Sequence, residues 1–366
     1  MDESPAVPRD VDVVVIGAGQ AGLSAAYHLR RRGFTPVDRA VGSGTFVVLD
    51  ADATPGGAWQ HRWESLRMGT VNGIHELPGF EVPPADPRAP SRDILPSYFD
   101  EYERRFDLAV RRPVKVRAVR RTGDGERLRI ETENGAWSAR HVVNATGTWS
   151  RPFWPHYPGR DLFQGRQLHT ADYVSAEEFA GKRVIIVGAG VSALQLLDEI
   201  SRVAETLWMT RREPQWVEED FDIPARIAAL AGVEERVRQG LPPGSVISVT
   251  GMHWTPWARA AQERGVLVRH PMFTAIEPDG VRMPDGSFLA ADVILWATGF
   301  RPALDHLAPL GLRTPAGGIR VDGTMAIDEP RLHLIGYGPS QSTIGANRAG
   351  RAAVAAIVAE RQAVAA

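Results

Sequence analysis

The stretch that decides the fold is Val11-Asp-Val-Val-Val-Ile-Gly17-Ala-Gly19-Gln20-Ala-Gly22, a β-branched apolar run that ends in three spaced glycines. The residues after it, 21–32, have the spacing of a helix. A strand, a tight turn and a helix start in this order are typical of a phosphate-binding loop. The first glycine makes the turn, the second lets a diphosphate approach the backbone, and the third lets the helix pack close to the strand. The N–H groups of the helix N-terminus then face the phosphates.

A second copy of this pattern lies further along the chain. It reads Arg183-Val-Ile-Ile-Val-Gly188-Ala-Gly190-Val-Ser192-Ala193 and runs into a helical stretch at 192–203. Ala193 replaces the third glycine, which this pattern tolerates. One such loop is weak evidence, because glycines also mark ordinary turns, but two copies in the same context are much stronger. The sequence therefore predicts an α/β protein with two Rossmann-like dinucleotide-binding domains.

Each half also contains a later strand that ends in small residues. The first ends in Ala145-Thr146-Gly147 and the second in Ala297-Thr298-Gly299. A Pro-rich connector follows the first, and Phe300-Arg-Pro follows the second. The simplest arrangement is nested: a first domain from 10–150 and 300–366 is interrupted by a second domain at 151–299.

The residue that ends the second strand of each domain indicates which dinucleotide it binds. Asp50 follows the buried run Phe46-Val-Val-Leu49, whereas the other candidate acid, Asp38, lies among turn residues. A carboxylate at this place accepts hydrogen bonds from a ribose diol and repels a 2′-phosphate, so Asp50 suits FAD or NAD. In the second domain Arg211 and Arg212 occupy this place, and their guanidinium groups favour NADPH over NADH.

Composition excludes several classes of function. The chain has 366 residues, 42 Lys plus Arg against 44 Asp plus Glu, and no cysteine. A formal charge of -2 gives no reason to expect nucleic acid or an anionic membrane as partner, so a small-molecule substrate is expected. Without cysteine there is no disulfide, thiolate metal site or redox dithiol. The ten histidines show no ligand spacing, so no metal is expected. The acidic start and the lack of a long apolar run predict a cytoplasmic protein.

Five motifs together resemble the class B flavin-dependent monooxygenases, the group with the flavin-containing monooxygenases, the plant YUCCA enzymes and the Baeyer–Villiger enzymes. They are the two loops at 17–22 and 188–193, Gly56-Gly57-Ala-Trp59, Phe163-Gln-Gly-Arg-Gln-Leu-His169-Thr-Ala-Asp-Tyr173, and Ala297-Thr298-Gly299-Phe300. The fourth is similar to the family fingerprint FxGxxxHxxxY/W. Tyr173 stands where Baeyer–Villiger enzymes usually have Trp, so the chain is more similar to the flavin-containing monooxygenase and YUCCA branch, in its compact bacterial form.

The resemblance implies an NADPH-binding domain inserted into an FAD-binding domain, with FAD and NADPH as cofactors and dioxygen as co-substrate. Hydride from NADPH would reduce the flavin, and a flavin C4a-(hydro)peroxide would pass one oxygen atom to an amine, a sulfide or a carbonyl compound. The alternative is an FAD-dependent NADPH oxidoreductase that passes electrons to another acceptor. A third possibility is a redox sensor that binds both nucleotides without turnover. The cofactor-binding residues implied are Gly17, Gly19, Gln20, Gly22, Asp50, Gly56, Gly57, Trp59, Thr146, Gly147, Gly188, Gly190, Ser192, Ala193, Arg211, Arg212, Thr298, Gly299 and Gly338.

The catalytic candidates are Asn72, His169 and Tyr173. Asn72 resembles the family's asparagine next to the flavin, although the Pro-Lys that follows it in the family is Ile74-His75 here. His169 has a side chain that titrates near neutrality, which suits an acid or base, but a structural brace between the domains is the preferred interpretation. Helices are expected at 91–106 and 345–363, and a small antiparallel meander between 111 and 137. The aromatic, Pro-rich segment 241–257 is predicted either to line the substrate pocket or to cover the core.

Overall fold

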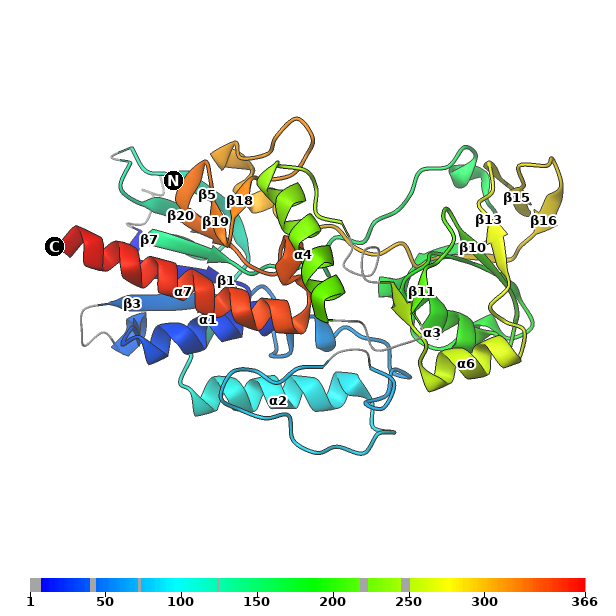
Figure 1. Cartoon of the computed structure of the whole chain (residues 1–366), viewed down its shortest axis with the longest axis horizontal. Helices are drawn as coiled ribbons and strands as arrows, with labels where there is room; N and C mark the ends of the chain where they lie inside the picture. Colours follow the sequence, from blue (N-terminus) through cyan, green and yellow to red (C-terminus); the bar gives the residue numbers. More distant parts are fainter. Residues whose placement is uncertain are drawn as a thin grey trace, which may run out of the picture.

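The computed structural model describes residues 8–39, 44–71, 74–123, 125–217, 223–244 and 251–365, with only the backbone described at 223–229 and 364–365. These residues form two lobes that lie side by side, each built on a sheet with a parallel centre (Figure 1). The predicted α/β class with two Rossmann-like units is confirmed.

The sheet of the first lobe contains ten of the described strands. Its main path is β18-β19-β20-β7-β1-β3-β2, and β4, β5 and β6 pair at the side of it. The central strands β3, β1, β7 and β20 are parallel to one another. Strands β5, β6 and β7 pair antiparallel and form the expected meander. The strands are β1 (Arg9–Ile16), β2 (Thr35–Pro36), β3 (Thr45–Leu49), β4 (Val110–Arg111), β5 (Val116–Arg121), β6 (Leu128–Thr132), β7 (Gly135–Asn144), β18 (Val321–Asp322), β19 (Met325–Ala326) and β20 (Glu329–Leu334).

The sheet of the second lobe is parallel throughout, in the order β13-β10-β9-β17-β8. Its strands are β8 (Arg166–His169), β9 (Arg183–Val187), β10 (Glu205–Thr210), β13 (Arg269–Pro271) and β17 (Val293–Trp296). Two small sheets accompany it. They consist of β11 (Trp216–Val217) with β12 (Met252–His253), and of β14 (Ala275–Glu277), β15 (Gly280–Arg282) and β16 (Phe288–Ala290).

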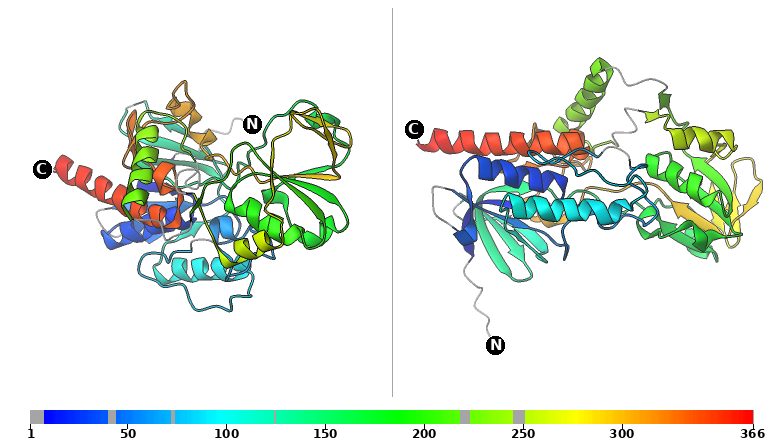
Figure 2. Two further views of the ribbon diagram at one scale, coloured as in Figure 1. Left: turned by 45° about the vertical axis from the view of Figure 1, so that its right-hand side comes forward. Right: turned by 90° about the horizontal axis from the view of Figure 1, so that it is seen from below.

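Helices cover the faces of these sheets, as Figures 1 and 2 show. In the first lobe, α1 (Gln20–Arg31) and α7 (Thr343–Ala365) pack on each other and on the parallel strands, and α2 (Ser91–Arg105) lies beside them. A side chain at Gly350 of α7 would place its Cβ 2.7 Å from Ser24 Oγ and 2.8 Å from the Ala25 N of α1, so glycine permits this close crossing. In the second lobe, α3 (Val191–Ile200) and α6 (Pro256–Glu263) pack on each other. The helices expected at 91–106 and 345–363 are thus confirmed.

Two connecting segments join the lobes and pair with each other. Phe153 N donates to Gly299 O at 2.9 Å, and Arg301 N donates to Arg151 O at 2.8 Å. Pro152 and Phe300 form an antiparallel bridge between these bonds. The outgoing and returning connectors therefore make a short two-stranded hinge.

The threonines of the two Ala-Thr-Gly motifs hold this hinge at its ends. Thr146 Oγ1 donates to Ala303 O at 2.7 Å, and Thr298 Oγ1 donates to Phe153 O. Both glycines that follow have positive φ, 60° at Gly147 and 75° at Gly299, so the chain turns there in a conformation that favours glycine. Thus each motif ends a strand of its lobe and begins a connector.

Each lobe also contributes side chains to the core of the other. Helix α4 (Ile223–Arg238) lies in the range predicted for the second domain, yet its Val237 is buried in the core of the first lobe. In return, Trp63 and Leu66 of the first range are buried in the core of the second lobe. Figure 2 shows α4 lying over the first lobe, away from the second sheet. The assignment of 10–150 with 300–366 to one domain and of 151–299 to another stays a prediction. Val237 of α4, and Trp63 with Leu66, each pack in the lobe opposite to the one that this assignment gives them.

Candidate functional site

The first glycine loop crosses the carboxyl end of its sheet at very close range. Gly17 has φ +99°, and a Cβ there would lie 2.6 Å from Ala145 O of the first Ala-Thr-Gly motif. A Cβ at Gly22 would lie 1.9 Å from Gly17 O. A Cβ at Gly19, by contrast, would meet nothing within 4 Å. Packing therefore requires glycine at positions 17 and 22, whereas Gly19 leaves an open approach to the backbone.

The second loop repeats this geometry. Gly188 has φ +142°, and a Cβ there would lie 2.2 Å from Ala297 O of the second Ala-Thr-Gly motif. A Cβ at Gly190 would again meet nothing within 4 Å. Ala193 replaces the third glycine and is fully buried, so this turn of helix has room for a methyl group. Ser192 precedes it in the first turn of the helix and is half-buried.

The two helices that follow these loops begin without a side-chain cap. Gly19 and Gly190 are the N-cap residues of α1 and α3, and neither first turn contains an acidic residue. The first N–H groups of a helix need an acceptor, and the N-terminal end of the helix dipole attracts negative charge. Open space beside the second glycine and free N–H groups together fit the diphosphate of a dinucleotide at each loop.

Asp50 lies where the ribose acid of the first site is predicted, directly after β3. Its Oδ2 accepts hydrogen bonds from Ala18 N and from Arg112 Nη2, each at 3.3 Å. Burial raises the pKa of Asp50, and the charge of Arg112 opposes that shift. Arg112 in turn donates two bonds of 2.6 Å to Glu103. The rejected candidate, Asp38, lies in a short 3-10 helix on the surface and pairs with Arg111.

Arg211 and Arg212 lie at the end of β10, the equivalent place in the second lobe. Both are exposed, and neither forms an ion pair with any residue that the structure describes. The neighbouring strand β13 supplies Arg269, whose Nε donates to Thr210 Oγ1 at 2.8 Å. Thus the end of β10 is anchored, and the two guanidinium groups beyond it are available to an anion such as a 2′-phosphate.

The Gly56-Gly57-Ala-Trp59 motif packs directly against the first loop. It forms a 3-10 turn, η2 (Gly57–Trp59), in which a Cβ at Gly57 would lie 2.8 Å from Gly19 Cα. A Cβ at Gly56 would lie 2.8 Å from Pro96 of α2. Trp59 is half-buried against the core of the first lobe. This motif therefore forms one wall of the opening at the first loop.

Two further residues of the predicted FAD site connect the loop to α7. Gln20 Nε2 donates to Asn347 Oδ1 at 3.0 Å, so the start of α1 is tied to the first turns of α7. Gly338 begins another 3-10 turn, η7 (Gly338–Gln341), which leads into α7. A Cβ at Gly338 would lie 2.8 Å from Val237 Cγ2 of α4, so glycine here allows α4 to dock.

His169 is completely buried at the end of β8, and both ring nitrogens are bonded. Nδ1 accepts from Ala171 N at 3.1 Å, which leaves Nε2 to donate to Gly299 O at 3.0 Å. Burial lowers the pKa of His169, so the ring is neutral at physiological pH. Its ring also lies edge-on to Phe300, with 4.9 Å between the centroids. These contacts favour a positioning role: His169 holds the returning connector of the hinge.

The second catalytic candidate, Tyr173, lies in a core rather than at a glycine loop. Tyr173 is buried in the core of the second lobe, between Trp63 and Phe179. Burial raises the pKa of Tyr173, and nearby Glu199 adds to this shift, so the phenol stays protonated. This environment favours a packing role. Asn72 lies outside the described residues, and its role stays a prediction.

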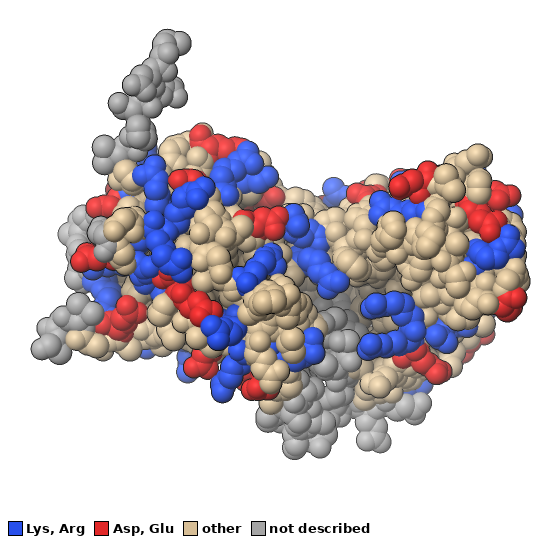
Figure 3. All heavy atoms as spheres, turned by 90° about the horizontal axis from the view of Figure 1, so that it is seen from above, with Lys and Arg blue, Asp and Glu red and all other residues tan. Residues whose placement is uncertain are grey.

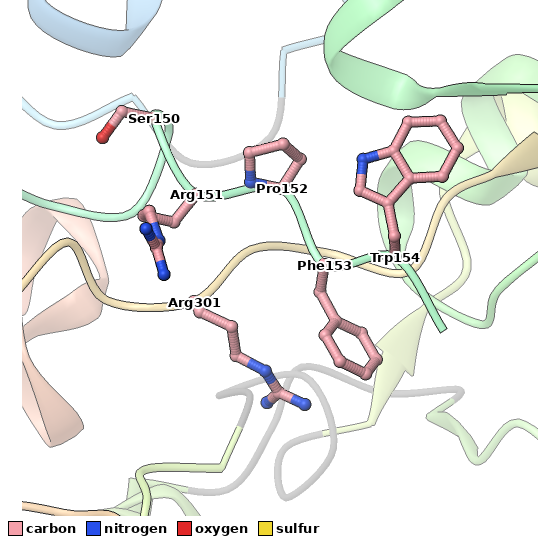
Figure 4. Close-up of a pocket in the computed structure, with 6 residues that line it drawn as sticks. All are labelled: Ser150, Arg151, Pro152, Phe153, Trp154 and Arg301. Carbon is pink, nitrogen blue, oxygen red and sulfur yellow. The ribbon is translucent and has the colours of Figure 1, made fainter. Parts of the chain in front are cut away.

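A cavity of about 440 Å³ opens at the hinge. Its lining comes from both connectors, and Figure 4 shows the guanidinium of Arg301 beside the ring of Phe153. The Arg301 Cζ lies 4.0 Å from that ring's centroid. Trp154 and Arg151 also line the cavity. Figure 3 shows a hollow between the two lobes with Lys and Arg on both sides of it. An apolar body with an anionic group fits the chemistry of this lining.

The segment 241–257, predicted as a pocket wall or a core cover, divides between the lobes. Directly before its first residue, Gly240 O accepts from Thr314 Oγ1 of the first lobe at 2.6 Å. At the other end, Trp254 stacks on Trp216 with 3.8 Å between the ring centroids. Residues 245–250 lie outside the described part of the chain. The described ends cover the lobes and do not line the hinge cavity.

Sequence reasoning missed three elements of this site. Arg112, which neutralises Asp50, gives no motif and is identified only by its contacts. Arg62 and Trp149 face each other near the first loop, although they are far apart in the sequence. The only signal for Trp149 was its place after an Ala-Thr-Gly motif.

Some kinds of site find no support in the described residues. They contain no group of three or more His, Asp or Glu side chains that suits a metal ion. No helix among them is long and apolar enough to cross a membrane.

The fold and site define a class of protein: a two-dinucleotide oxidoreductase in which one nucleotide unit is joined to the other through paired connectors. A family model described as pyridine nucleotide-disulphide oxidoreductase matches residues 14–247. The chain belongs to this family. The name covers disulfide reductases, but a chain without cysteine has no dithiol to pass electrons to.

Individual relatives narrow the class further. The solved flavin-containing monooxygenase from Stenotrophomonas maltophilia superposes with a TM-score of 0.80 and is 39% identical, covering 96% of this chain and 99% of that one. A Baeyer-Villiger monooxygenase of Streptomyces coelicolor is 32% identical over 66% of this chain and 44% of its own length. The indole-3-pyruvate monooxygenase YUCCA1 of Oryza sativa is 31% identical over 55% of this chain and 49% of its own. The matches to these last two span less than half of each relative.

The chain therefore belongs to the flavin-dependent monooxygenases, and it is an oxidoreductase that uses FAD and NADPH. The resemblance found in the five motifs is confirmed. The assignment of individual residues to each cofactor stays a prediction.

Proposed function

We propose that this protein uses NADPH and dioxygen to insert one oxygen atom into a small amine, sulfide or carbonyl compound. The observation that carries the proposal is the pair of glycine loops, each with a free helix N-terminus, followed by an acid in one lobe and by two arginines in the other. The zero cysteine count and the monooxygenase relatives favour oxygenation over electron transfer to a disulfide.

The first lobe would hold FAD and the second NADPH. Gly17, Gly19 and Gly22 would admit the FAD diphosphate, and Asp50 would accept the ribose hydroxyls. Gly188, Gly190 and Ser192 would admit the NADPH diphosphate, and Arg211 with Arg212 would bind its 2′-phosphate. When bound, the flavin supplies the chemistry that activates dioxygen, and the protein binds, orients and excludes water.

The hinge would set the distance between the two cofactors. Thr146 and Thr298 tie the connectors at both ends, and His169 fixes Gly299 between them. A small substrate would enter through the hollow between the lobes, where Phe153 and Arg301 line the cavity. The proposal predicts that an aromatic or apolar substrate with an anionic group binds better than its neutral analogue.

The test is product analysis under labelled dioxygen. Purified enzyme with FAD and NADPH is given a panel of amines, sulfides, ketones and aromatic 2-oxo acids under ¹⁸O₂. The expected result is one ¹⁸O atom in a product and one NADPH oxidised per product formed. NADPH oxidation that yields only hydrogen peroxide with every compound, or electrons passed to a dye with no dependence on dioxygen, would overturn the proposal.

A further inference from the structure

Arg62 lies between two tryptophan rings next to the first glycine loop. Its Cζ is 5.5 Å from the centroid of Trp59 and 4.7 Å from the centroid of Trp149. Its Nε is shielded from solvent and has no hydrogen-bond partner. Within the described ranges, no carboxylate forms an ion pair with its guanidinium. The side chain is thus held in place by rings alone.

A half-buried cation whose Nε is shielded from water is costly to hold without a partner. Burial lowers the pKa of Arg62 to about 10. The penalty for taking a charge out of water exceeds what a cation–π contact returns. Arg112 offers a comparison, because its buried side chain is balanced by Asp50 and Glu103. Among the described residues, Arg62 has no such counter-charge.

The position of Arg62 shows where a counter-charge would come from. Trp59 ends the η2 turn, whose Gly57 packs on Gly19 at the first loop. Trp149 follows the first Ala-Thr-Gly motif and stacks on Phe300 of the returning connector, with 4.8 Å between ring centroids. Arg62 therefore lies where the wall of the first loop meets the hinge.

Asp52, an acidic residue of the same segment, is already engaged. Asp52 accepts from Gln60 Nε2 at 3.1 Å and from His61 Nε2 at 3.2 Å. His61 stacks on the Trp149 ring as well, with 6.1 Å between centroids. The side chains described around Arg62 thus supply aromatic faces, and within the described ranges its guanidinium is open to an anion from outside the chain.

We propose that Arg62 is an anion-binding residue that receives a phosphate group of a bound dinucleotide, with Trp59 and Trp149 fixing the plane of its guanidinium. The planar fork of an arginine suits two phosphate oxygens, and stacking on both faces removes the rotamer freedom that binding would otherwise cost. This inference deepens the proposed function and rests on it. The contact of Gly57 with Gly19 favours the FAD diphosphate as the source, and the phosphates of NADPH are the other source.

The test measures nucleotide affinity rather than turnover. Arg62→Met keeps the length and the apolar stem of the side chain and removes the charge. Apoprotein of the wild type and of the variant is titrated with FAD by fluorescence quenching, and ADP and adenosine compete for the same site. The holoenzyme is titrated with NADP⁺ by its visible difference spectrum. The matched control is Arg9→Met, since Arg9 also lies over a tryptophan, Trp137, with its Cζ 5.5 Å from the ring, but far from the loops.

A contact with the FAD diphosphate predicts at least 10-fold weaker binding of FAD and of ADP in Arg62→Met, with adenosine changed less than 2-fold. A contact with the second coenzyme predicts the loss in the NADP⁺ titration alone. Arg62→Lys keeps the charge without the fork and is expected to lose about 3-fold. Equal losses for FAD, ADP and adenosine would indicate a packing role and overturn the proposal. So would affinities for FAD and NADP⁺ that both stay within 2-fold.

These outcomes separate the inference from the proposed function. A wild-type protein that binds no FAD would contradict the cofactor assignment itself. A wild-type protein that binds FAD tightly, with an Arg62→Met variant that binds it equally well, would leave the function intact and reject only the role of Arg62. If Arg62→Met does not fold, the Arg62→Lys titrations and their dependence on salt decide the question.

Discussion

The two glycine loops share one backbone solution and differ in what surrounds it. In both, the first glycine has positive φ and approaches the carbonyl of an alanine in an Ala-Thr-Gly motif, Ala145 or Ala297. In both, the helix that follows begins without a side-chain cap. After the second strand, however, one lobe has a buried carboxylate and the other has two exposed guanidinium groups. The comparison indicates that the loop selects a diphosphate, and that the neighbouring strand end selects which dinucleotide carries it.

The third position of each loop gives the largest expected difference. A Cβ at Gly22 would lie 1.9 Å from Gly17 O, whereas the second loop already carries Ala193 at this place. We expect Gly22→Ala to reduce the bound flavin to less than about a tenth of the wild-type amount, because overpacking costs about 1–3 kcal/mol or more and moves the loop. The flavin-to-protein absorbance ratio of the purified variant measures it.

The reverse change supplies the control. Ala193→Gly removes a methyl group from α3 and should cost about 1 kcal/mol in stability with no loss of flavin. A Gly22→Ala variant that is fully loaded with FAD would contradict the assignment of the loop.

Acid should affect the first lobe through two buried histidines. Burial lowers the pKa of His306 and of His333 to about 4. Both stay neutral in the folded protein below pH 6.5, while the unfolded chain takes up protons there, so stability is complete above about pH 6.5 and is lost as the pH falls toward 4. At pH 5 the loss is about 2 kcal/mol for each histidine. The loss of stability is measured by urea unfolding at pH 8 and pH 5, with the release of flavin as the signal.

A substitution at His333 tests how much this residue contributes to the pH dependence of stability. His333 Nδ1 is hydrogen-bonded with Thr324 Oγ1 at 3.0 Å, and His333→Gln replaces the titrating ring with an amide. The variant should lose about half of the pH dependence. Equal unfolding free energies of the wild type at both pH values would show that these rings do not titrate on unfolding.

The strand end of the second lobe should control coenzyme choice. Arg211→Ala is expected to lower kcat/KM for NADPH by roughly 10- to 100-fold, because a hydrogen bond to a charged group contributes about 1.5–3 kcal/mol. The value for NADH should change less than about 3-fold, since it lacks the 2′-phosphate. Steady-state kinetics with both coenzymes test this, with Arg202→Ala on the same lobe as control, because Arg202 pairs with Asp198. A parallel decline for both coenzymes would mean that Arg211 does not bind the 2′-phosphate.

The smallest expected effect lies at the hinge. His169→Ala removes the bond to Gly299 O and should lower the fraction of NADPH that yields product by about 3-fold, with FAD binding close to wild type. Since burial lowers the pKa of His169, the rate between pH 7 and pH 9 should show no titration of this residue. Product and peroxide are measured together. Coupling equal to that of the wild type would leave His169 without a positioning role.

Much of this architecture could be predicted from the sequence because it depends on local patterns. The glycine loops and the parallel strands before them follow from spacing and from runs of buried residues, and the structure agrees with them. Asp50 lies buried directly after β3, and its choice over Asp38 as the ribose acid stays a prediction. The balance of Asp50 by Arg112 could not be predicted, since it depends on a contact between distant segments. The same holds for Tyr173, where a family motif marked the residue but only packing shows that its ring belongs to a core.

The exchange of core residues between the lobes has a consequence for any attempt to cut the protein. A gene fragment that encodes 151–299 alone would lack Trp63 and Leu66 from its interior and would leave Val237 of α4 without its pocket. The complementary fragment would lack Val237 from its core and would leave Trp63 and Leu66 without the core in which they are buried. The two nucleotide units are therefore interdependent in folding, so that neither half is a free-standing module to be transplanted into another enzyme.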